Sequence, residues 1–362
     1  MITKPLSPPW NDSGKTVPRA LARSASAGIE PRVLVARGDT GEWPPTVRAH
    51  AIYSGPGGYA TAVGERFRLM ANVWRLAGDA DVLHFFFQPH PLASGTARWL
   101  ARACRRPTVH TVLSAPADTH PPARLVFADR TVTLSAATAR RLALPGVRPP
   151  EVIPPALLET EPASDARARE ARNAAGLDPG FLLYPGDWEF SGGQDLLLEV
   201  WATDPSLPTL VLAGRDKTPR AAAARASLEH AARERGLAGR VRFLGTLPDL
   251  PALLASAGAV LFPARSLYAK TDLPLVILEA WRESRPVLVS DLPSLAESVV
   301  GVAVPLAHEA GAWREAVRRL ERDGPALGLA GRERFLERHT ATASAARYAT
   351  LYRELATPAE RS

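Results

Sequence analysis

The sequence is poor in cysteine and lysine and has no long apolar run. Its 362 residues include one cysteine, Cys104, which excludes an intrachain disulfide and a thiolate metal cluster. Lysine occurs only at Lys4, Lys15, Lys217 and Lys270, so arginine carries nearly all of the positive charge. No stretch of about 18 apolar residues predicts a membrane helix, and the first residues lack the apolar core of a secretion signal. We therefore expect a cytoplasmic protein.

The chain is too long for one ordinary hydrophobic core. A length of 362 residues with 46% apolar composition is sufficient for two domains, each of about 150 to 200 residues. We expect a first domain over residues 1–160 and a second over residues 179–340. An acidic, proline-containing linker would occupy residues 161–178, and an amphipathic helix at residues 341–356 would return to the first domain.

The net charge of +7 is unevenly distributed along the chain. Residues 1–150 hold 19 Lys and Arg against 9 Asp and Glu, whereas residues 151–362 hold 25 against 28. A basic half favours peripheral contact with anionic lipid at the inner face of a membrane, or with an acidic acceptor. A general preference for arginine explains the excess equally well. Nucleic acid is less favoured, because the basic residues are not interleaved with exposed aromatic residues.

Short apolar runs alternate with amphipathic stretches, which is typical of repeated βα units and parallel sheets. In the first half, strands are expected at residues 31–36, 47–53, 81–87, 107–113, 130–134 and 151–153. Helices are expected between them at residues 16–27, 60–76, 93–103 and 136–143. The second half repeats the pattern, with strands at residues 181–184, 209–213, 241–244, 259–262, 286–289 and 301–304. The pattern therefore predicts an α/β protein with two sheets.

One carboxylate interrupts an otherwise apolar helical run. Glu279 lies in TDLPLVILEAWRESRPVLVSDLP, shortly after Lys270 and Asp272. An ionised carboxylate in such a run needs a hydrogen-bonded partner, or it will take up a proton. The hydroxyl groups of a ligand would serve as that partner.

This stretch resembles the signature of GT4-like retaining glycosyltransferases of GT-B fold, the group 1 family. Their two glutamates, separated by seven residues, precede G-x-PVV-x-SD-x-P, which here reads SRPVLVSDLP. The resemblance covers about Ser7 to Leu355 and implies two Rossmann-like parallel-sheet domains facing a cleft. It implies that Glu279 binds the ribose of a nucleotide-sugar donor. The first glutamate, which contacts the donor sugar in the family, is replaced by Thr271, and we expect Asp272 to take over its contacts.

The segment LLYPGDWEFSGGQDLLLEVWA predicts a strand, a turn and a helix. Its turn places Gly192 and Gly193 at a helix N-terminus, where free N–H groups and the helix dipole favour an anion such as a diphosphate. A glycine-assisted tight turn is the alternative. The matching family segment carries a glycine, an arginine and a lysine, whereas this chain has Gly186, Asp187 and Gly192 at those positions.

Either replacement cations for the donor phosphates come from other segments, or the donor is not an ordinary nucleotide sugar, or the site is degenerate. The candidates are Lys270, Arg215 and Arg265, with Lys270 foremost because it directly precedes the altered Thr271 in a chain that otherwise uses arginine. A solvated loop lysine is the alternative for Lys270.

Two regions of the first domain are candidates for the acceptor side. The PPW loop resembles the first loop of the family, with Trp10, Asn11 and Lys15 on the acceptor side; a plain helix N-cap is the alternative for its Asn-Asp pair. His84 and His110 are expected near the carboxyl ends of adjacent parallel strands, where α/β proteins bind ligands. Each could donate a hydrogen bond or act as a base. Satisfied core histidines are the alternative.

The resemblance implies a metal-independent hexosyltransferase that transfers a sugar to a glycan or lipid-linked acceptor with retention. In this family the leaving phosphate helps to deprotonate the acceptor, so neither a protein nucleophile nor a cofactor is expected. Asp79-Ala80-Asp81 has the D-x-D pattern of metal-dependent transferases, but it precedes a strand, and we interpret it as a solvated turn. The altered phosphate positions leave two alternatives: a non-catalytic GT-B protein that binds a sugar or partner, and a transferase with a lipid-linked donor.

Overall fold

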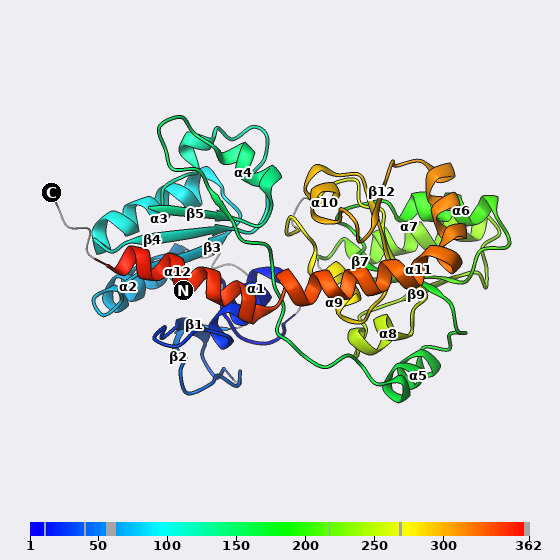
Figure 1. The fold of residues 1–362 in the computed structure, drawn as a ribbon, viewed down its shortest axis with the longest axis horizontal. Coiled ribbons are helices and arrows are strands. Elements are labelled where there is room, and N and C mark those ends of the chain that lie inside the picture. Colours follow the sequence, from blue (N-terminus) through cyan, green and yellow to red (C-terminus); the bar gives the residue numbers. More distant parts are fainter. Residues whose placement is uncertain (11, 40, 56–62, 217, 268–269, 358–362) are drawn as a thin grey trace. The chain divides into compact units, whose positions relative to one another are not determined.

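Parallel strands covered by helices build both halves of the chain, as the sequence pattern predicts (Figure 1). The structure is a computed structural model, and it describes residues 1–10, 12–39, 41–55, 63–216, 218–267 and 270–357. The chain divides into two units. Unit 1 comprises Met1–Glu159 together with Arg338–Ser362, and unit 2 comprises Thr160–Glu337.

Six parallel strands are described in unit 1, in the groups β1-β2 and β3-β4-β5-β6. They are β1 (Arg32–Ala36), β2 (Arg48–Tyr53), β3 (Leu83–Phe87), β4 (Thr108–Val112), β5 (Arg130–Thr133) and β6 (Glu151–Val152). The first residues of the chain lie between the two groups. Ile2 N donates to the His84 carbonyl of β3 at 2.7 Å, and Leu6 N donates to the Leu34 carbonyl of β1 at 2.9 Å. This short segment therefore joins the two groups of strands. It is too short for its sequence to show a strand pattern.

The described α-helices of unit 1 include the last helix of the chain. They are α1 (Ser13–Arg23), α2 (Val63–Ala77), α3 (Pro91–Cys104), α4 (Ala136–Leu142) and α12 (Ala341–Ala356), and a 3-10 turn, η1, spans Pro122–Arg124. Helix α12 packs on α1. Its buried face carries Tyr348, whose hydroxyl lies 2.8 Å from the Thr111 hydroxyl, and Tyr352, whose hydroxyl lies 2.5 Å from His84 Nδ1. The amphipathic face predicted for this helix is confirmed.

Helix α1 begins at Ser13 rather than at residue 16 as expected, because a carboxylate caps it. Asp12 Oδ1 accepts a hydrogen bond from Gly14 N at 2.7 Å. Pro18 lies inside the helix and has no N–H to donate to the Gly14 carbonyl. The Thr3 hydroxyl donates to that carbonyl instead, at 3.1 Å. The helix therefore tolerates its internal proline.

Unit 2 is built on one parallel sheet with the strand order β12-β11-β10-β7-β8-β9. The strands are β7 (Leu182–Asp187), β8 (Leu210–Arg215), β9 (Val241–Leu244), β10 (Ala259–Phe262), β11 (Val287–Ser290) and β12 (Val304–Leu306). From β7 the chain runs to one edge through β8 and β9, and it then returns to the other side of β7 at β10. Open α/β sheets bind ligands at the carboxyl ends of the strands that flank such a switch point. The expected ligand site of unit 2 is therefore the end of β7 and β10.

Helices cover the sheet of unit 2 on both faces. They are α5 (Asp165–Ala174), α6 (Gln194–Thr203), α7 (Ala221–Glu234), α8 (Leu250–Ser256), α9 (Leu275–Arg282), α10 (Pro293–Ser298) and α11 (Ala310–Arg338). Three fully buried tryptophans, Trp201, Trp281 and Trp313, are among the largest side chains of its core. The segment expected to be a linker carries α5, which packs against α8 within unit 2. Among the helices of the described ranges, none is long and apolar enough to cross a membrane.

The twelve expected strands all occur in the expected order. The largest displacement is at β12, which was expected at residues 301–304 and begins at Val304. The preceding residues form a turn instead, because Gly301 has φ 78° and the N–H groups of Val302 and Ala303 both donate to the Val299 carbonyl. The apolar run at residues 301–304 predicts a strand, but its first residues form the turn that follows α10.

Candidate functional site

The loop between β7 and α6 requires glycine for steric reasons. Three successive residues, Ser191, Gly192 and Gly193, have positive φ angles of 75°, 68° and 93°. A Cβ atom on Gly193 would lie 1.7 Å from the Pro263 carbonyl oxygen, which belongs to the residue after β10. The loop therefore closes directly over the switch point. Helix α6 begins at Gln194, so the turn before a helix N-terminus is confirmed.

Asp187, the last residue of β7, is the centre of a cluster of charges. Its side chain is fully buried, and Arg215 donates to its Oδ1 from Nη2 at 2.9 Å and from Nε at 3.1 Å. Lys270 forms an ion pair with its Oδ2. Asp187 and Arg215 stand opposite each other in the parallel register of β7 and β8. The position where the family has an arginine thus holds a carboxylate that gathers two cations.

The cluster brings two cations to the switch point. Lys270 and Arg215 both pair with the Asp187 carboxylate, and their side chains are 14% and 35% exposed. Partial burial strengthens the interaction of these charges with a nearby anion, because fewer water molecules screen them. Two of the three sequence candidates for phosphate contacts are therefore brought together.

Glu279 occupies the position on α9 that the sequence pattern predicts. The flanking Leu278 and Ala280 are fully buried, whereas Glu279 itself is partly buried. Burial raises the pKa of the Glu279 carboxyl to about 7, against the opposing attraction of Arg282 and Arg215. Within the described ranges no residue forms a hydrogen bond to this carboxylate. The carboxylate therefore lies within the field of the Arg215 cation and is available to ligand hydroxyls.

Thr271 and Asp272 lie buried just before α9. The Thr271 hydroxyl donates to the Leu273 carbonyl at 2.9 Å, so it stabilises its own loop. This contact gives Thr271 a local structural function at the place where the family has a glutamate.

Arg265 lies apart from the Asp187 cluster. Its side chain is 55% exposed and donates to Asp195 in the first turn of α6 at 2.5 Å and to His308 Nε2 at 3.0 Å. It borders the glycine turn, because a Cβ atom on Gly192 would lie 3.4 Å from its Cδ. Arg265 is thus placed at the rim of the turn.

Two further features of this edge were not found from the sequence. Gly186 lies against the Tyr184 ring, where a Cβ atom would lie 2.6 Å from the hydroxyl oxygen. Gly214 similarly lies against the Trp188 ring, with a Cβ atom 2.2 Å from its nearest ring carbons. Trp188 stacks on Phe243 at 6.2 Å. The strand-end glycines are therefore needed for aromatic packing, a reason that only the tertiary structure reveals.

The acceptor-side candidates of the first loop form internal contacts in unit 1. Lys15 is buried, and its Nζ donates to the Ser7 carbonyl at 2.9 Å. Trp10 packs edge-on against Trp43 at 6.2 Å, with the Arg19 guanidinium 4.3 Å from its ring centre. Asn11 lies outside the described residues. The observed contacts of Lys15 and Trp10 stabilise the loop that follows the first segment of the sheet.

The expected position of His84 is wrong. It is the second residue of β3, near the amino end, because the strand begins only at Leu83. Both ring nitrogens are bonded, Nδ1 to Tyr352 and Nε2 to Thr111 at 2.7 Å, and burial holds its pKa well below the usual value. His84 is thus the satisfied core histidine that the sequence left as an alternative.

The expected position of His110 near the carboxyl end of its strand is also wrong, because it lies in the middle of β4, where aromatic rings enclose it. It contacts Phe87 and Phe127, with ring centres 4.2 and 4.9 Å away, and its Nε2 lies 3.2 Å from the Phe87 carbonyl. Burial lowers the pKa of His110 to about 3. The side chain is therefore neutral at physiological pH and is a weak base.

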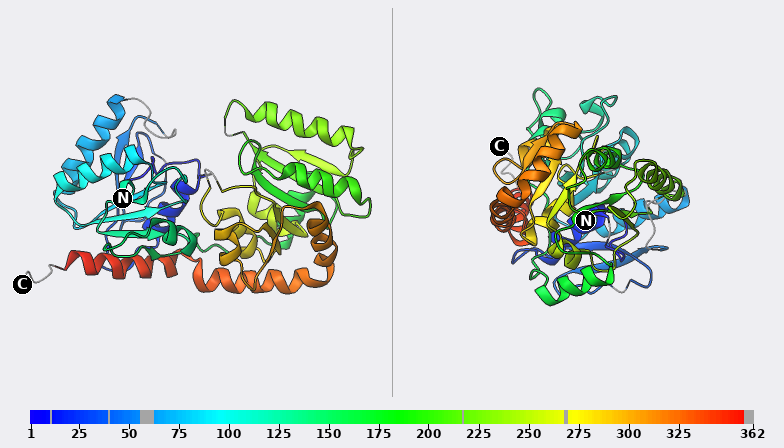
Figure 2. Two further views of the ribbon diagram at one scale, coloured as in Figure 1. Left: turned by 90° about the horizontal axis from the view of Figure 1, so that it is seen from above. Right: turned by 90° about the vertical axis from the view of Figure 1, so that its right-hand side faces the viewer.

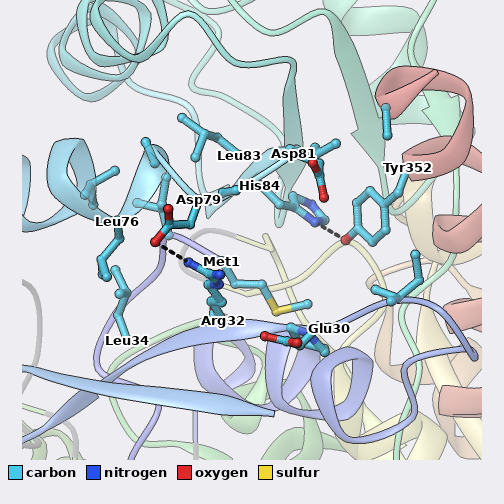
Figure 3. A pocket seen from close by; sticks show the side chains of 18 of the residues that line it. Met1, Glu30, Arg32, Leu34, Leu76, Asp79, Asp81, Leu83, His84 and Tyr352 are labelled. Carbon is cyan, nitrogen blue, oxygen red and sulfur yellow. Dashed lines mark hydrogen bonds and ion pairs between the residues drawn. The ribbon is translucent and has the colours of Figure 1, made fainter. Parts of the chain in front are cut away.

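A pocket of about 360 Å³ lies in unit 1 beside the amino ends of β1 and β3 (Figure 3). Its wall includes the His84 and Tyr352 pair, as well as Asp79, which forms an ion pair with Arg32 at 3.6 Å. Parallel α/β sheets bind ligands at the opposite, carboxyl edge. The charged switch point of unit 2 is therefore the stronger candidate for the functional site.

The sequence of unit 2 matches a described protein family. Residues 181–323, which begin before β7 and include the glycine turn, the Asp187 cluster and Glu279, match the family described as Glycosyl transferases group 1. Unit 2 carries a group 1 glycosyl transferase domain. Among proteins with curated descriptions, none matches the sequence.

Solved structures of glycosyltransferases share the fold of the whole chain. HepE from Anabaena, solved with UDP and glucose, has a TM-score of 0.69 and 18% identity over 86% of this chain and 87% of HepE. Sucrose-phosphate synthase from Thermosynechococcus elongatus has a TM-score of 0.73 and 22% identity, over 93% and 92% of the two chains. WaaG, a glycosyltransferase involved in lipopolysaccharide biosynthesis, has a TM-score of 0.64 and 17% identity, over 96% and 97%. At such low identity the likeness establishes the GT-B fold, with the group 1 domain as its second Rossmann-like unit.

Proposed function

We propose that the chain is a glycosyltransferase that takes its sugar from a nucleoside diphosphate donor bound by unit 2. The observation that supports this most strongly is the assembly of Arg215 and Lys270 on the buried Asp187 at the switch point. A diphosphate leaving group gains negative charge as the glycosidic bond breaks, and fixed cations stabilise that charge without reorganisation. The free N–H groups at the start of α6 add to this stabilisation.

In this proposal Asp187 substitutes for the missing arginine indirectly. It cannot contact a phosphate favourably itself, but it holds two cations at the ends of β7 and β8. The carboxylate offsets part of their positive charge, so the site has a weaker field than a pair of unopposed cations. No metal ion is required by this arrangement.

Glu279 would accept hydrogen bonds from the ribose hydroxyls of the donor. Such bonds favour the ionised carboxylate, whereas burial in the unliganded protein favours the protonated form. Donor binding near pH 7 would therefore release a proton. HepE has been solved with UDP and with UDP-glucose, which makes uridine the first nucleoside to test.

Acceptor recognition by unit 1 and retention of configuration complete the proposal. Because His110 is buried and its pKa is lowered to about 3, we assign acceptor deprotonation to the leaving phosphate and not to this histidine. We assign donor-sugar hydroxyl contacts to Asp272, beside the altered Thr271. The acceptor would be a glycan or a lipid-linked sugar.

A calorimetric titration with UDP, GDP and ADP in the absence of added metal tests the proposal. We expect one nucleotide to bind, with Glu279→Gln weakening its affinity about tenfold, which is about 1.4 kcal/mol. Lys270→Ala should weaken UDP more than uridine. Glu315→Gln, on the exposed face of α11, is the matched control and should leave the affinity unchanged.

The same titration in two buffers of different ionisation enthalpy measures the released proton. Proton release by the wild type, lost in Glu279→Gln, would support the ribose assignment. Absence of binding by all three nucleotides to folded protein would overturn the nucleotide donor. It would favour a non-catalytic sugar-binding protein or a lipid-linked donor, two alternatives suggested by the departures at Asp187, Gly192 and Thr271.

A further inference from the structure

Large apolar side chains are exposed on two neighbouring helices of unit 1. Phe67 and Trp74 on α2 are 66% and 64% exposed, and Leu92 and Trp99 on α3 are 75% and 58% exposed. Isolated exposed apolar residues are ordinary on soluble proteins, but grouped aromatic residues mark interaction sites. Both tryptophans found exposed among the described residues belong to this group.

The helical period places these side chains on the outer faces of their helices. Each pair is seven residues apart, or about two turns, so its members lie on one side of the helix. The inner side of α2 buries Val73 and Ala77 instead, and α3 buries Ser94, Ala97 and Leu100. The exposed group is therefore additional to what the core requires.

Topology brings the two outer faces together. Helix α2 connects β2 to β3 and α3 connects β3 to β4, and right-handed crossovers in the same direction lie on one face of a sheet. The two helices contact each other, and Figure 2 shows them side by side, with α12 on the other side of the sheet. Their outward residues thus form one surface, which we call the α2–α3 face.

The α2–α3 face is also basic. It carries the exposed Arg68, Arg75 and Arg102, and no acidic residue occurs within α3 or in residues 67–77 of α2. The nearest carboxylate after α2, Asp79, lines the pocket of unit 1 and pairs with Arg32. Arginines beside exposed tryptophans therefore characterise this surface.

We infer that the α2–α3 face is a docking surface for an anionic membrane. Tryptophan and phenylalanine side chains enter the boundary between headgroups and acyl chains, where arginines meet anionic headgroups. A second copy of the chain is a poorer occupant, because a symmetric contact through this face would bring arginines against arginines. Docking through this face would hold the enzyme near a lipid-linked acceptor. Only this purpose rests on the proposed function.

Co-sedimentation of the whole protein with vesicles tests the inference without any sugar transfer. We expect binding to phosphatidylcholine vesicles that contain phosphatidylglycerol, weaker binding at high salt, and little binding to phosphatidylcholine alone. The double variant Trp74→Ser, Trp99→Ser should lower the partition coefficient about tenfold or more. Leu329→Ser with Leu336→Ser, at the exposed surface of α11, is the control that should sediment like the wild type.

Nucleotide titration and thermal unfolding of each variant separate this inference from the proposed function. Retained nucleotide binding with lost sedimentation would confirm the docking surface. Failure of the wild type to bind anionic vesicles would overturn it, whatever the nucleotide result. Equal sedimentation of the tryptophan variant and the wild type would also overturn it. A wild-type dimer in light scattering that is lost only in the tryptophan variant would overturn it as well.

Discussion

The two Rossmann-like units bury titratable groups of opposite kinds. Unit 2 buries an acid, Glu279, whose pKa is raised to about 7. Unit 1 buries His110, whose pKa is lowered to about 3, and His84, whose pKa is also lowered. Burial disfavours the charged form in all three cases, so one physical cause produces opposite responses to pH.

The sign of each response follows from proton binding. Between its ordinary pKa of 4.5 and about 7, Glu279 binds more protons in the folded chain than in the unfolded chain, so unit 2 loses stability as pH rises. Between about 3 and its ordinary 6.5, His110 binds more protons when unfolded, so unit 1 gains stability as pH rises. His84 is satisfied within the core at both ring nitrogens, whereas the acid lacks a described partner. The two units therefore differ in how their buried titratable groups are paired.

The largest expected effect comes from removing the charge of Asp187, the buried carboxylate of unit 2. Asp187→Asn removes a charged partner of both Arg215 and Lys270, and we expect a loss of about 3 to 5 kcal/mol of unfolding free energy. Asp195→Asn breaks the exposed pair with Arg265 and should cost under about 1 kcal/mol. Hydrogen exchange resolved by peptide should show the loss in unit 2 and not in unit 1. Equal losses of unfolding free energy for the two substitutions would contradict the central role of Asp187 in the charge cluster.

Gly193→Ala tests the glycine turn that carries the charged edge of unit 2. The new Cβ would overlap the Pro263 carbonyl and favour a negative φ, so we expect a loss of about 3 kcal/mol. Gly192→Ala is the matched control, because it shares the positive φ but has space for a Cβ, and it should cost about 1 kcal/mol. Chemical denaturation measures both. A smaller effect at residue 193 than at residue 192 would contradict the close approach of the loop to β10.

The stabilities of the two units should depend on pH in opposite directions. Lowering the pH from 8 to 5 should stabilise unit 2 by about 2 kcal/mol through Glu279 and destabilise unit 1 by about 2 kcal/mol through His110. Protection of peptides from α9 and from β4 in hydrogen exchange reports the two units separately. Glu279→Gln should flatten the first slope and His110→Gln the second. Parallel slopes in both units would show that other groups dominate.

The smallest expected effect concerns Arg265 at the rim of unit 2. Because its side chain is 55% exposed, Arg265→Ala should change the free energy of unfolding by less than about 1 kcal/mol. If Arg265 also contacts the donor phosphates, UDP affinity should fall while uridine affinity is unchanged. Calorimetry with both compounds decides whether this cation belongs to the site.

Periodicity predicted the strands well, because buried parallel strands are short continuous apolar runs. Periodicity alone does not locate the switch point, because that point follows from the order of the strands in the sheet. The turn before α6 and the placement of Glu279 were predicted from local sequence. The ion pairs of Asp187 were not, since they depend on the register of β7 against β8 and on a loop some eighty residues later in the chain.

Histidine positions were harder to predict for a related reason. His84 was expected near the carboxyl end of its strand, but β3 begins only at Leu83, so His84 is its second residue. Its partners, Thr111 and Tyr352, lie on β4 and on the last helix, so no local pattern could show that its ring is satisfied. Sequence indicates which residues are able to act, and tertiary contacts decide which of them are already occupied.

The division of unit 1 into two separate stretches of chain affects how the protein folds during synthesis. Unit 2 is continuous from Thr160 to Glu337, whereas unit 1 also needs α12, which follows unit 2. The ribosome therefore releases a complete unit 2 while the Thr111 hydroxyl and the His84 ring still await Tyr348 and Tyr352. Unit 2 can mature first, and unit 1, which carries the α2–α3 face, folds last.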